Sequence, residues 1–411
     1  MSRPESTPGP PRIKGLSTIS SSLEHEKLRV LHTATGNLYG GVETFLRTLA
    51  RHRGDAPGLE QRFAMVFEGR AAGELREAGA DVDVLGDVRF SRPWTILKAR
   101  RALKQVLRRF RPDVVVTHGA WTHGLVAPVA HRAGLPTALW LHDILSMTHW
   151  VEKLAFRTPP ALVLANSRHT AGNVPKAFPK SRCEVLYYPV DLHPTPREPA
   201  RTEVRNELKT GQDDVVIVTA CRLERWKGQA FLIEGLAKLV DLPGWTAWIA
   251  GGPQRPHEQV YFDELQAAAQ SAGLSNRVRF LGQRRDVPRL LAAADVHCQP
   301  NTGPEPFGIA YIEALASGLP VVSTNIGGAA EIVTEACGTL VPVHDANALA
   351  DALRRLVVDP ACRTRLGSGG PARAAELCAP GTVLARFEEL LHGVSQRADA
   401  TQSAVLAHPR G

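Results

Sequence analysis

Along the chain, short runs of β-branched and aliphatic residues alternate with longer stretches whose apolar residues recur at helical spacing. In the first half, the short runs predict strands at Leu28–Ala34, Arg62–Phe67, Asp81–Leu85, Asp113–His118, Thr137–His142 and Ala161–Ala165. Helical spacing lies between them at Val42–Arg51, Gly73–Ala78, Trp94–Phe110 and Thr122–Ala133. Strands that alternate with helices in this way predict a parallel sheet with helices on both faces.

The alternation stops at a proline-rich segment, Pro189–Arg201, and then starts again. The second set of predicted strands is Asp214–Ala220, Thr246–Ala250, Arg277–Leu281, Asp295–Gln299, Pro320–Ser323 and Thr339–Val341. Predicted helices separate them at Gln229–Val240, Glu258–Ala272, Val287–Ala293 and Ile309–Ala316. Proline-rich connections of this kind are semi-rigid linkers, so the chain divides into two α/β halves.

We therefore predict two Rossmann-like, doubly wound domains that face each other across a cleft. The N-terminal domain takes residues 27–192, a linker 193–206 and the C-terminal domain 207–395. The Pro- and Ser-rich extension 1–26 and the tail 396–411 are expected to be disordered. Ligands bind to open α/β sheets at the carboxyl ends of the strands, which here would face the cleft.

Composition narrows the class of protein. With 44% hydrophobic and 22% charged residues, the chain is typical of a globular protein. It has no apolar run of the length that spans a membrane, and its N-terminus lacks the apolar core of a secretory signal. Six scattered cysteines without C-x-x-C spacing argue against a zinc site and against a disulfide framework. These features predict a cytoplasmic protein.

The net charge of +8 comes from one segment. Nine of the 49 Lys and Arg residues lie between Arg89 and Arg111, where there is no Asp or Glu, so the remaining 40 are balanced by 41 acidic residues. No nucleic-acid-reading motif accompanies this charge, and we expect no nucleic-acid partner. Apolar residues at helical spacing within 94–110 predict a helix that packs on the sheet and exposes its charges. A functional alternative is that this charged face contacts anionic lipid.

Two short motifs contain features suited to phosphate binding. Gly40-Gly41 stands between the first strand and its helix, where paired glycines let a ligand approach backbone amides at a helix N-terminus. A tight turn with packing glycines would look the same. Arg222 and Lys227 follow the first strand of the second half, and together offer a planar fork and a point charge to a diphosphate. In isolation these cations are equally typical of a solvated loop.

The third motif is the most specific. Glu305-Pro-Phe-Gly-Ile places two carboxylates, Glu305 and Glu313, on either side of a glycine that opens a helix. Carboxylates accept hydrogen bonds from sugar and ribose hydroxyls, and the amides at the helix N-terminus favour phosphate between them. A surface helix with two solvated acids is the simpler alternative.

Together these motifs resemble the retaining nucleotide-sugar glycosyltransferases of the two-Rossmann-domain (GT-B) type known as family 4, or glycosyl transferases group 1. The resemblance rests on Gly40-Gly41-Val-Glu, on Arg222 with Lys227-Gly228, and on Glu305-Pro-Phe-Gly-Ile-x-x-x-Glu313. It continues through Ala314-Leu-Ala-Ser-Gly-Leu-Pro and Gly327-Gly328-x-x-Glu331-Ile-Val. These motifs occur in the family's order over about 300 residues.

The resemblance implies the following roles. Arg222 and Lys227 bind the donor diphosphate, Glu305 contacts hydroxyls of the donor sugar, and Glu313 holds the ribose. The donor also lies against the remaining positions of the shared motifs, namely Gly40, Gly41, Phe307, Gly308 and Ile309. His142, in Leu139-Trp-Leu-His-Asp143, is placed beside the transferred sugar, and His118 on the acceptor side. A histidine at the end of a strand is otherwise often just hydrogen-bonded to a neighbouring loop.

We expect no metal cofactor. The one D-x-D motif, Asp81-Val82-Asp83, lies in a predicted strand far from the donor motifs, and Arg222 with Lys227 can neutralise a leaving diphosphate. The predicted activity is the transfer of a hexosyl unit to a hydroxyl acceptor in glycan, exopolysaccharide or glycolipid synthesis. The alternatives are a nucleotide-sugar epimerase and a non-catalytic sugar-nucleotide-binding subunit on the same fold. The donor's base and sugar stay open, and the segment 146–160 leaves the acceptor open.

Overall fold

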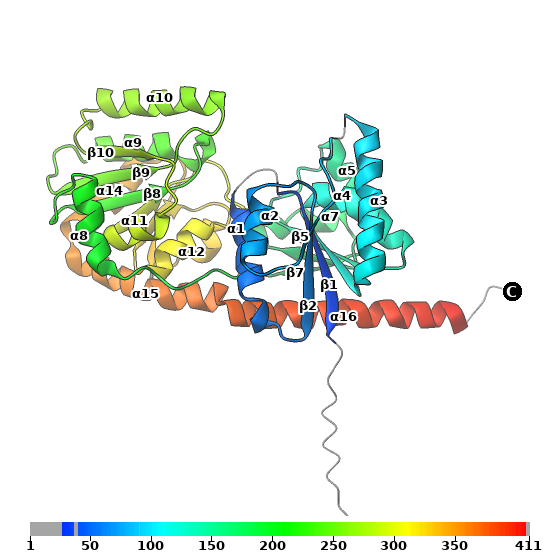
Figure 1. The fold of residues 1–411 in the computed structure, drawn as a ribbon. Coiled ribbons are helices and arrows are strands. Elements are labelled where there is room, and N and C mark those ends of the chain that lie inside the picture. Colours follow the sequence, from blue (N-terminus) through cyan, green and yellow to red (C-terminus); the bar gives the residue numbers. More distant parts are fainter. Residues whose placement is uncertain (1–26, 37–39, 90, 408–411) are drawn as a thin grey trace, which may run out of the picture.

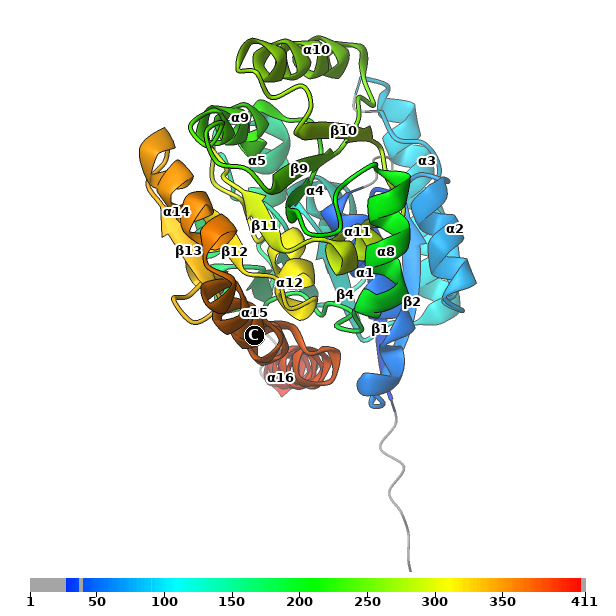
Figure 2. The same ribbon diagram turned by 90° about the vertical axis from the view of Figure 1, so that its left-hand side faces the viewer.

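The computed structural model describes residues 27–36, 40–89 and 91–407. The expectation of disorder for residues 1–26 lies outside this range. The chain forms two α/β domains that lie side by side, and two long C-terminal helices run along both (Figure 1). Turning the molecule by 90° brings the C-terminal domain in front of the N-terminal one (Figure 2). All six cysteines are free thiols, as their spacing predicted.

The N-terminal domain is built on a seven-stranded parallel sheet of order β3-β2-β1-β4-β5-β6-β7. Its strands are β1 Leu28–Ala34, β2 Leu59–Met65, β3 Val82–Val84, β4 Val114–His118, β5 Thr137–Leu141, β6 Leu162–Ala165 and β7 Arg182–Val185. Its helices are α1 Gly41–Arg51, α2 Arg70–Glu77, α3 Pro93–Phe110, α4 Ala120–Arg132, α5 Trp150–Phe156, α6 Arg168–Ala171 and α7 Val174–Ala177. Every residue of β4 and β5 is buried, which is why these central strands read as continuous apolar runs.

The C-terminal domain repeats this plan with a six-stranded parallel sheet of order β10-β9-β8-β11-β12-β13. Its strands are β8 Val215–Ala220, β9 Trp245–Ala250, β10 Val278–Gly282, β11 Val296–Gln299, β12 Val321–Thr324 and β13 Gly338–Val341. Its helices are α8 Arg197–Glu207, α9 Gln229–Ala237, α10 Pro256–Ser271, α11 Val287–Ala293, α12 Ile309–Ala316, α13 Ala329–Ile332, α14 Ala346–Val358 and α15 Pro360–Cys378. The strand order reverses next to β1 and next to β8, and ligands bind doubly wound sheets at such points.

The expected linker at 193–206 is shorter in the structure, because α8 begins at Arg197. The prolines that suggested a linker continue to Pro199. Glu198 before it is extended, and a proline at the start of the regular helical run that follows does not stop that run. Arg205 fixes α8 to the C-terminal domain. Its fully buried guanidinium donates to the carbonyl of Ala293 and pairs with Asp295 at 2.6 Å.

The end of the chain also differs from the expectation. The last helix, α16 Pro380–Ala407, passes under the N-terminal sheet, so residues 380–395 do not belong to the C-terminal core, and 396–407 are helical (Figure 1). Phe387 packs against the rings of His32 and Trp140, with centroids 5.8 and 5.0 Å apart. Buried apolar residues recur at helical spacing along this stretch: Val383, Leu384, Phe387, Leu390, Leu391 and Val394. The burial of this apolar stripe on the sheet accounts for the helix.

Candidate active site

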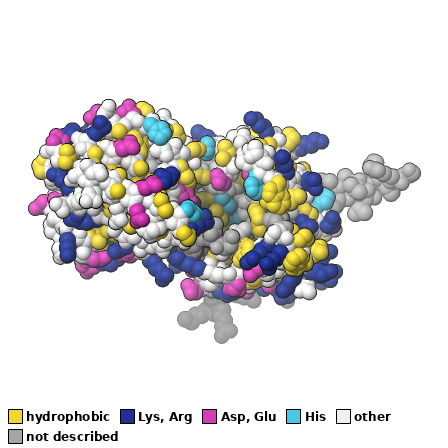
Figure 3. All heavy atoms as spheres, turned by 90° about the horizontal axis from the view of Figure 1, so that it is seen from above, with side chains coloured by type: hydrophobic (Ala, Val, Ile, Leu, Met, Phe, Trp, Pro, Cys, Tyr) yellow, Lys and Arg dark blue, Asp and Glu magenta, His cyan; other side chains and the backbone are white. Residues whose placement is uncertain are grey.

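A pocket of about 360 Å³ lies between the two domains, at the carboxyl ends of their strands. Seen from above, the surface is hollowed between the two lobes (Figure 3). Both domains supply side chains or backbone to its wall: Gly40, Gly41, His142, Asp143, Asn166 and Tyr188 from the first, and Arg222, Trp226, Lys227, Gln299, Glu305, Phe307, Gly308 and Ile309 from the second. Eight of the predicted donor residues, and His142, therefore meet in one place.

Lys227 and Glu305 form an ion pair at the centre of this wall. Both side chains are almost buried, with 11% and 12% of their surfaces exposed. Glu305 also accepts a hydrogen bond from the Asn301 amide at 3.1 Å, and the Lys227 ammonium lies 4.2 Å from the centre of the Trp226 ring. An ammonium has three N–H donors, so Lys227 can keep Glu305 and still donate to a ligand.

Glycines allow the loops around this pair to pack closely. Gly228 follows Lys227 with φ +77°, and a Cβ there would lie 1.9 Å from the carbonyl oxygen of Pro300. A Cβ on Gly327 would lie 2.4 Å from the Glu305 carbonyl oxygen, and the Gly328 amide donates to that oxygen at 2.7 Å. Only glycine permits this contact, so the Gly327-Gly328 motif supports the loop that carries Glu305.

The N-terminus of α12 opens onto the pocket. Gly308 precedes the helix with φ +110°, a conformation that favours glycine, and it leaves the amides of Ile309 and Ala310 on the pocket wall. Unpaired amides at a helix start carry partial positive charge and attract anions. A Cβ on Gly41 of the first domain would lie 3.6 Å from Cδ1 of Ile309, so the start of α1 is close to the start of α12.

Arg222 is more exposed than Lys227. Half of its side chain is open to solvent, and its guanidinium pairs with Glu224 at 2.8 Å. Across the pocket, the Gly40 amide donates to Glu43 at 2.9 Å, and burial raises the pKa of Glu43 while Arg222 lowers it. The Gly40-Gly41 turn is thus held by its own helix and stands opposite Arg222.

His142 ends a row of three histidines, of which His118 and His32 are buried and His142 is partly exposed to the pocket. His118 Nδ1 lies 3.0 Å from His142 Nε2, and His118 Nε2 lies 3.1 Å from His32 Nδ1. The other nitrogen of His142, Nδ1, is 2.5 Å from the hydroxyl oxygen of Tyr188, which also accepts from Asn166 at 2.9 Å. Burial lowers the pKa of His142 and of His32 to about 3, so both rings are neutral at physiological pH.

His118 lines a second pocket, of about 470 Å³, which adjoins the first through Gly40, Gly41, His142, Asp143 and Arg222. Trp121 of α4 and His149 and Glu152 near α5 form its far side. The segment 146–160 therefore contributes to this second pocket, which is the one on the predicted acceptor side.

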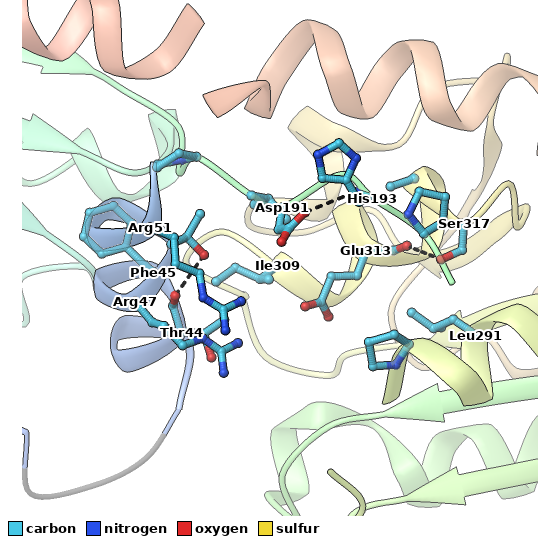
Figure 4. Close-up of a pocket in the computed structure, with 16 residues that line it drawn as sticks. Thr44, Phe45, Arg47, Arg51, Asp191, His193, Leu291, Ile309, Glu313 and Ser317 are labelled. Atoms are coloured by element: carbon cyan, nitrogen blue, oxygen red, sulfur yellow. Dashed lines mark hydrogen bonds between the residues drawn. The ribbon is translucent and has the colours of Figure 1, made fainter. Parts of the chain in front are cut away.

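Glu313 does not line the pocket that holds Lys227. It lies in a neighbouring space of about 180 Å³ between α1, α11 and α12, where it faces Arg47 (Figure 4). Burial raises the pKa of Glu313 to about 7, and Arg47 lowers it in part. Ile309 lines both spaces, so they adjoin along α12.

Several pocket residues were not predicted from the sequence. Asn166 and Gln299 stand at or just after the carboxyl ends of β6 and β11, a position that could have identified them. Asp143 lines both pockets, and burial raises its pKa. Tyr188 comes from the loop before the linker, where no sequence pattern marked it.

Glu331, the last acid of the glycine motif, connects the two domains. Its carboxylate accepts from the backbone amides of Arg168 and His169 at the start of α6, both at 3.0 Å, and from the Tyr187 hydroxyl at 3.1 Å. Phe307 packs between Tyr187 and Tyr188 of the first domain. These contacts fix the position of the Glu305 loop relative to His142.

The D-x-D residues lie away from the site. Asp83 is on the edge strand β3, where it pairs with Arg62 at 3.2 Å and with Arg109. Within the described residues, no three His, Cys, Asp or Glu side chains gather as they would around a metal ion. In the same part of the chain, no helix is long and apolar enough to cross a membrane.

Two parallel α/β domains with a polar interdomain pocket define the GT-B class, and solved structures share this fold. Anabaena HepE, crystallised with UDP and glucose, superposes with a TM-score of 0.77 at 27% identity, over 89% of this chain and all of that one. The family model for Glycosyltransferase Family 4 matches residues 39–193, and that for Glycosyl transferases group 1 matches residues 200–373. The chain belongs to the group 1 glycosyltransferases.

Two curated relatives illustrate the family. A GDP-mannose-dependent alpha-(1-6)-phosphatidylinositol monomannoside mannosyltransferase of Mycolicibacterium smegmatis is 32% identical over 294 residues, 66% of this chain and 73% of that one. The lipopolysaccharide core biosynthesis glycosyltransferase LpsD of Rhizobium meliloti is 29% identical over 344 residues, 84% of this chain and 92% of that one. The predictions of a group 1 glycosyltransferase and of the GT-B fold are confirmed.

Proposed function

We propose that this protein is a retaining glycosyltransferase that moves a hexosyl unit from a nucleoside diphosphate sugar to a hydroxyl of a glycan or lipid-linked acceptor. One observation carries the proposal: Lys227, Glu305 and the start of α12 meet Gly40-Gly41 and His142 across a single interdomain pocket. Cations and helix amides suit a diphosphate, and a carboxylate beside them suits sugar hydroxyls.

In this proposal the donor lies along α12. Its diphosphate meets Lys227 and the amides of Ile309 and Ala310, with Arg222 at the open side. The sugar extends toward Glu305 and His142, and the ribose toward Glu313, whose space adjoins the pocket at Ile309. Known relatives support a nucleotide-sugar donor, since HepE was crystallised with UDP-glucose and the mycobacterial relative is named for GDP-mannose. Because one of these relatives is associated with a UDP sugar and the other with a GDP sugar, the base of this protein's donor stays open.

The chemistry follows from stabilising the leaving group. The bond between the anomeric carbon and the donor phosphate breaks, and the diphosphate takes the electron pair, stabilised by Lys227 and the helix amides. The acceptor hydroxyl then bonds to the anomeric carbon on the face that the diphosphate leaves, and its proton passes to a phosphate oxygen. Glu305 is already paired with Lys227, and neutral His142 has both nitrogens occupied, so neither serves as a general acid; they position the sugar.

A panel of nucleotide sugars tests the donor site. A ligand at about 100 times its Kd stabilises a fold by roughly 2.7 kcal/mol, which a thermal shift detects. For the donor that binds, NMR of the product with a simple sugar acceptor should show the donor's anomeric configuration, and activity should persist in excess chelator. An inverted product, a changed sugar released without acceptor, or full loss of activity in chelator would contradict the mechanism.

The proposal includes a cytoplasmic location and contact with an anionic membrane through α3. Its outer face exposes Trp94 and Leu97, at 64% and 55%, beside Lys98 and Arg101. Trp150 of α5 is also 55% exposed, and it lines a pocket together with Ile96 and Arg100 of α3. Aromatic and cationic side chains together favour a lipid interface.

The structure changes which charges should matter for this contact. Arg100 turns inward and donates to the carbonyls of Gly124 and Leu125, and Arg109 pairs with Asp83. Flotation with vesicles of phosphatidylcholine, with and without phosphatidylglycerol, should show binding only to the anionic vesicles. Lys98→Gln with Arg101→Gln should weaken it, and Lys238→Gln with Arg255→Gln on the other domain should not. Equal binding to neutral vesicles would exclude this contact.

A further inference from the structure

Another cavity of the N-terminal domain, distinct from the two pockets described above, has a strongly basic wall. It holds about 430 Å³ between the last turns of α3 and α4. Its wall consists of Lys104, Leu107, Arg108, Arg111, Pro112, Val129, Arg132, Ala133 and Leu135. Crossover helices run antiparallel to their strands, so this end of α3 lies opposite the interdomain cleft, about 27 Å from its start. The cavity is therefore separate from the donor and acceptor pockets.

Four cations surround this cavity: Lys104, Arg108, Arg111 and Arg132. No acidic side chain lines it, and none of the four forms an ion pair with another described residue. Arg111 ends α3 with φ +52°, a backbone conformation in which glycine is usual. Like charges at this density repel one another, and a bound anion would relieve that repulsion.

The floor of the cavity is apolar. Leu107 and Val129 are buried in the core beneath α3, and Leu135 packs against the same cluster. A free inorganic phosphate would meet the cations and leave this floor unused. A phosphate group that carries a glycerol and acyl chains would meet both.

We propose that this cavity binds the phosphate headgroup of an anionic phospholipid, with the cations on the phosphate and Leu107, Val129 and Leu135 against its glycerol and first methylenes. The site does not depend on the proposed glycosyl transfer. It would fix the C-terminal end of α3 on a membrane while Trp94 and Leu97 meet the same surface at the other end. The acceptor pocket lies near that other end, at the carboxyl ends of the strands.

Binding of a monomeric lipid tests the cavity without a membrane. Dihexanoyl phosphatidylglycerol below its micellar concentration, and inorganic phosphate in a parallel arm, are titrated into the full chain by calorimetry at low, fixed ionic strength, where exposed charges are least screened. Lys104→Gln with Arg132→Gln removes two charges from the cavity wall. Lys238→Gln with Arg255→Gln removes two charges from the other domain and is the matched control.

The lipid should bind more tightly than phosphate, and the cavity variant should raise its Kd about tenfold while the control changes it less than about threefold. Equal affinity for phosphate and lipid, equal weakening by the two variants, or no binding of the lipid would overturn the proposal. Donor-induced thermal shifts, measured on the same variants, should stay unchanged. A failure of the donor site would therefore be seen separately.

Discussion

Replacement of Lys227 by Met is the sharpest test of the donor site. The ammonium is the most buried cation of the pocket. In the proposed binding mode, its charge lies where the leaving diphosphate gains negative charge during transfer. Met keeps most of the chain length and the contact with Trp226 but removes the charge. We expect kcat to fall more than the KM for the donor rises, because the lost interaction is stronger in the transition state than in the ground state.

The expected loss of rate in Lys227→Met follows from the burial of the Lys227 side chain. A unit charge about 4 Å from another, at the effective dielectric of a protein surface, interacts with about 4 kcal/mol. Removing one preorganised donor from an active site costs roughly 2.7–4 kcal/mol, or about 10² to 10³ in rate. Lys227, with 11% of its side chain exposed, should lie in this range. Arg222 is half-exposed and already paired with Glu224, so Arg222→Met should cost only about tenfold.

The assay is the initial rate of nucleoside diphosphate release with saturating acceptor, over a range of donor concentrations. Unfolding temperatures serve as the control, because Lys227→Met also leaves the Glu305 carboxylate without its cation. Lys227→Arg, which keeps the charge, should retain more activity than Lys227→Met. A Met variant that is folded and within about threefold of the wild-type rate, or a larger loss from Arg222→Met, would refute the assignment.

Three other substitutions test the scaffold of the site. Glu331→Ala removes the acceptor for two amides of α6 and should lower the unfolding temperature by a few degrees and raise the donor KM, seen in melting curves and donor titrations. Burial raises the pKa of Glu313 from 4.5 to about 7, so its folding contribution is intact below pH 4.5 and lost as pH rises through 7. Denaturant unfolding should therefore show Glu313→Gln gaining up to about 3 kcal/mol over wild type between pH 5 and pH 8; a constant difference would show that the carboxyl titrates normally. Gly228→Ala should cost about 2 kcal/mol or more, whereas Gly244→Ala, with φ +76° and open space around it, should cost about 1; equal losses would show that Pro300 yields.

Local sequence patterns predicted most of the fold. The bounds of β1, α11 and α12 agree with the runs Leu28–Ala34, Val287–Ala293 and Ile309–Ala316, because each run is short, mostly apolar and followed within two positions by a polar residue. The strand β7 was not predicted, since Arg182–Val185 is a partly exposed, polar segment at the sheet edge. Only its pairing with β6 makes it a strand.

Long-range packing could not be predicted in the same way. The apolar stripe of α16 is visible in the sequence, but the stripe alone does not say which sheet it covers. In the structure Phe387 reaches His32 and Trp140 of the N-terminal core, more than 240 residues earlier in the chain. A boundary drawn from local composition therefore placed this helix in the wrong domain.

In the candidate site, too, local motifs could be predicted from the sequence, and contacts between distant residues could not. The motifs identified Lys227 and Glu305 separately as donor-binding residues. They did not predict the ion pair between them, which joins residues 78 positions apart. His142 was identified through the resemblance to the family, whereas His32 was not, because a buried histidine within a strand carries no sequence signal. Glu313 was expected to hold the ribose of the donor, and the structure places it with Arg47 in the space that adjoins the pocket of Lys227.

The contacts of Glu331 connect the glycine motif, which lies outside the pocket wall, to the other domain. Gly327 and Gly328 hold the backbone of the Glu305 loop, and Glu331, one turn later, holds the start of α6 in the other domain. The motif thus ties the Glu305 loop of the C-terminal domain to the domain that carries His142. Because the pocket wall comes from both domains, a loss of this tie changes the distance between Glu305 and His142 without altering either residue. The relative position of the two domains is therefore itself part of the proposed donor site, and Glu331 acts on that position from outside the pocket wall.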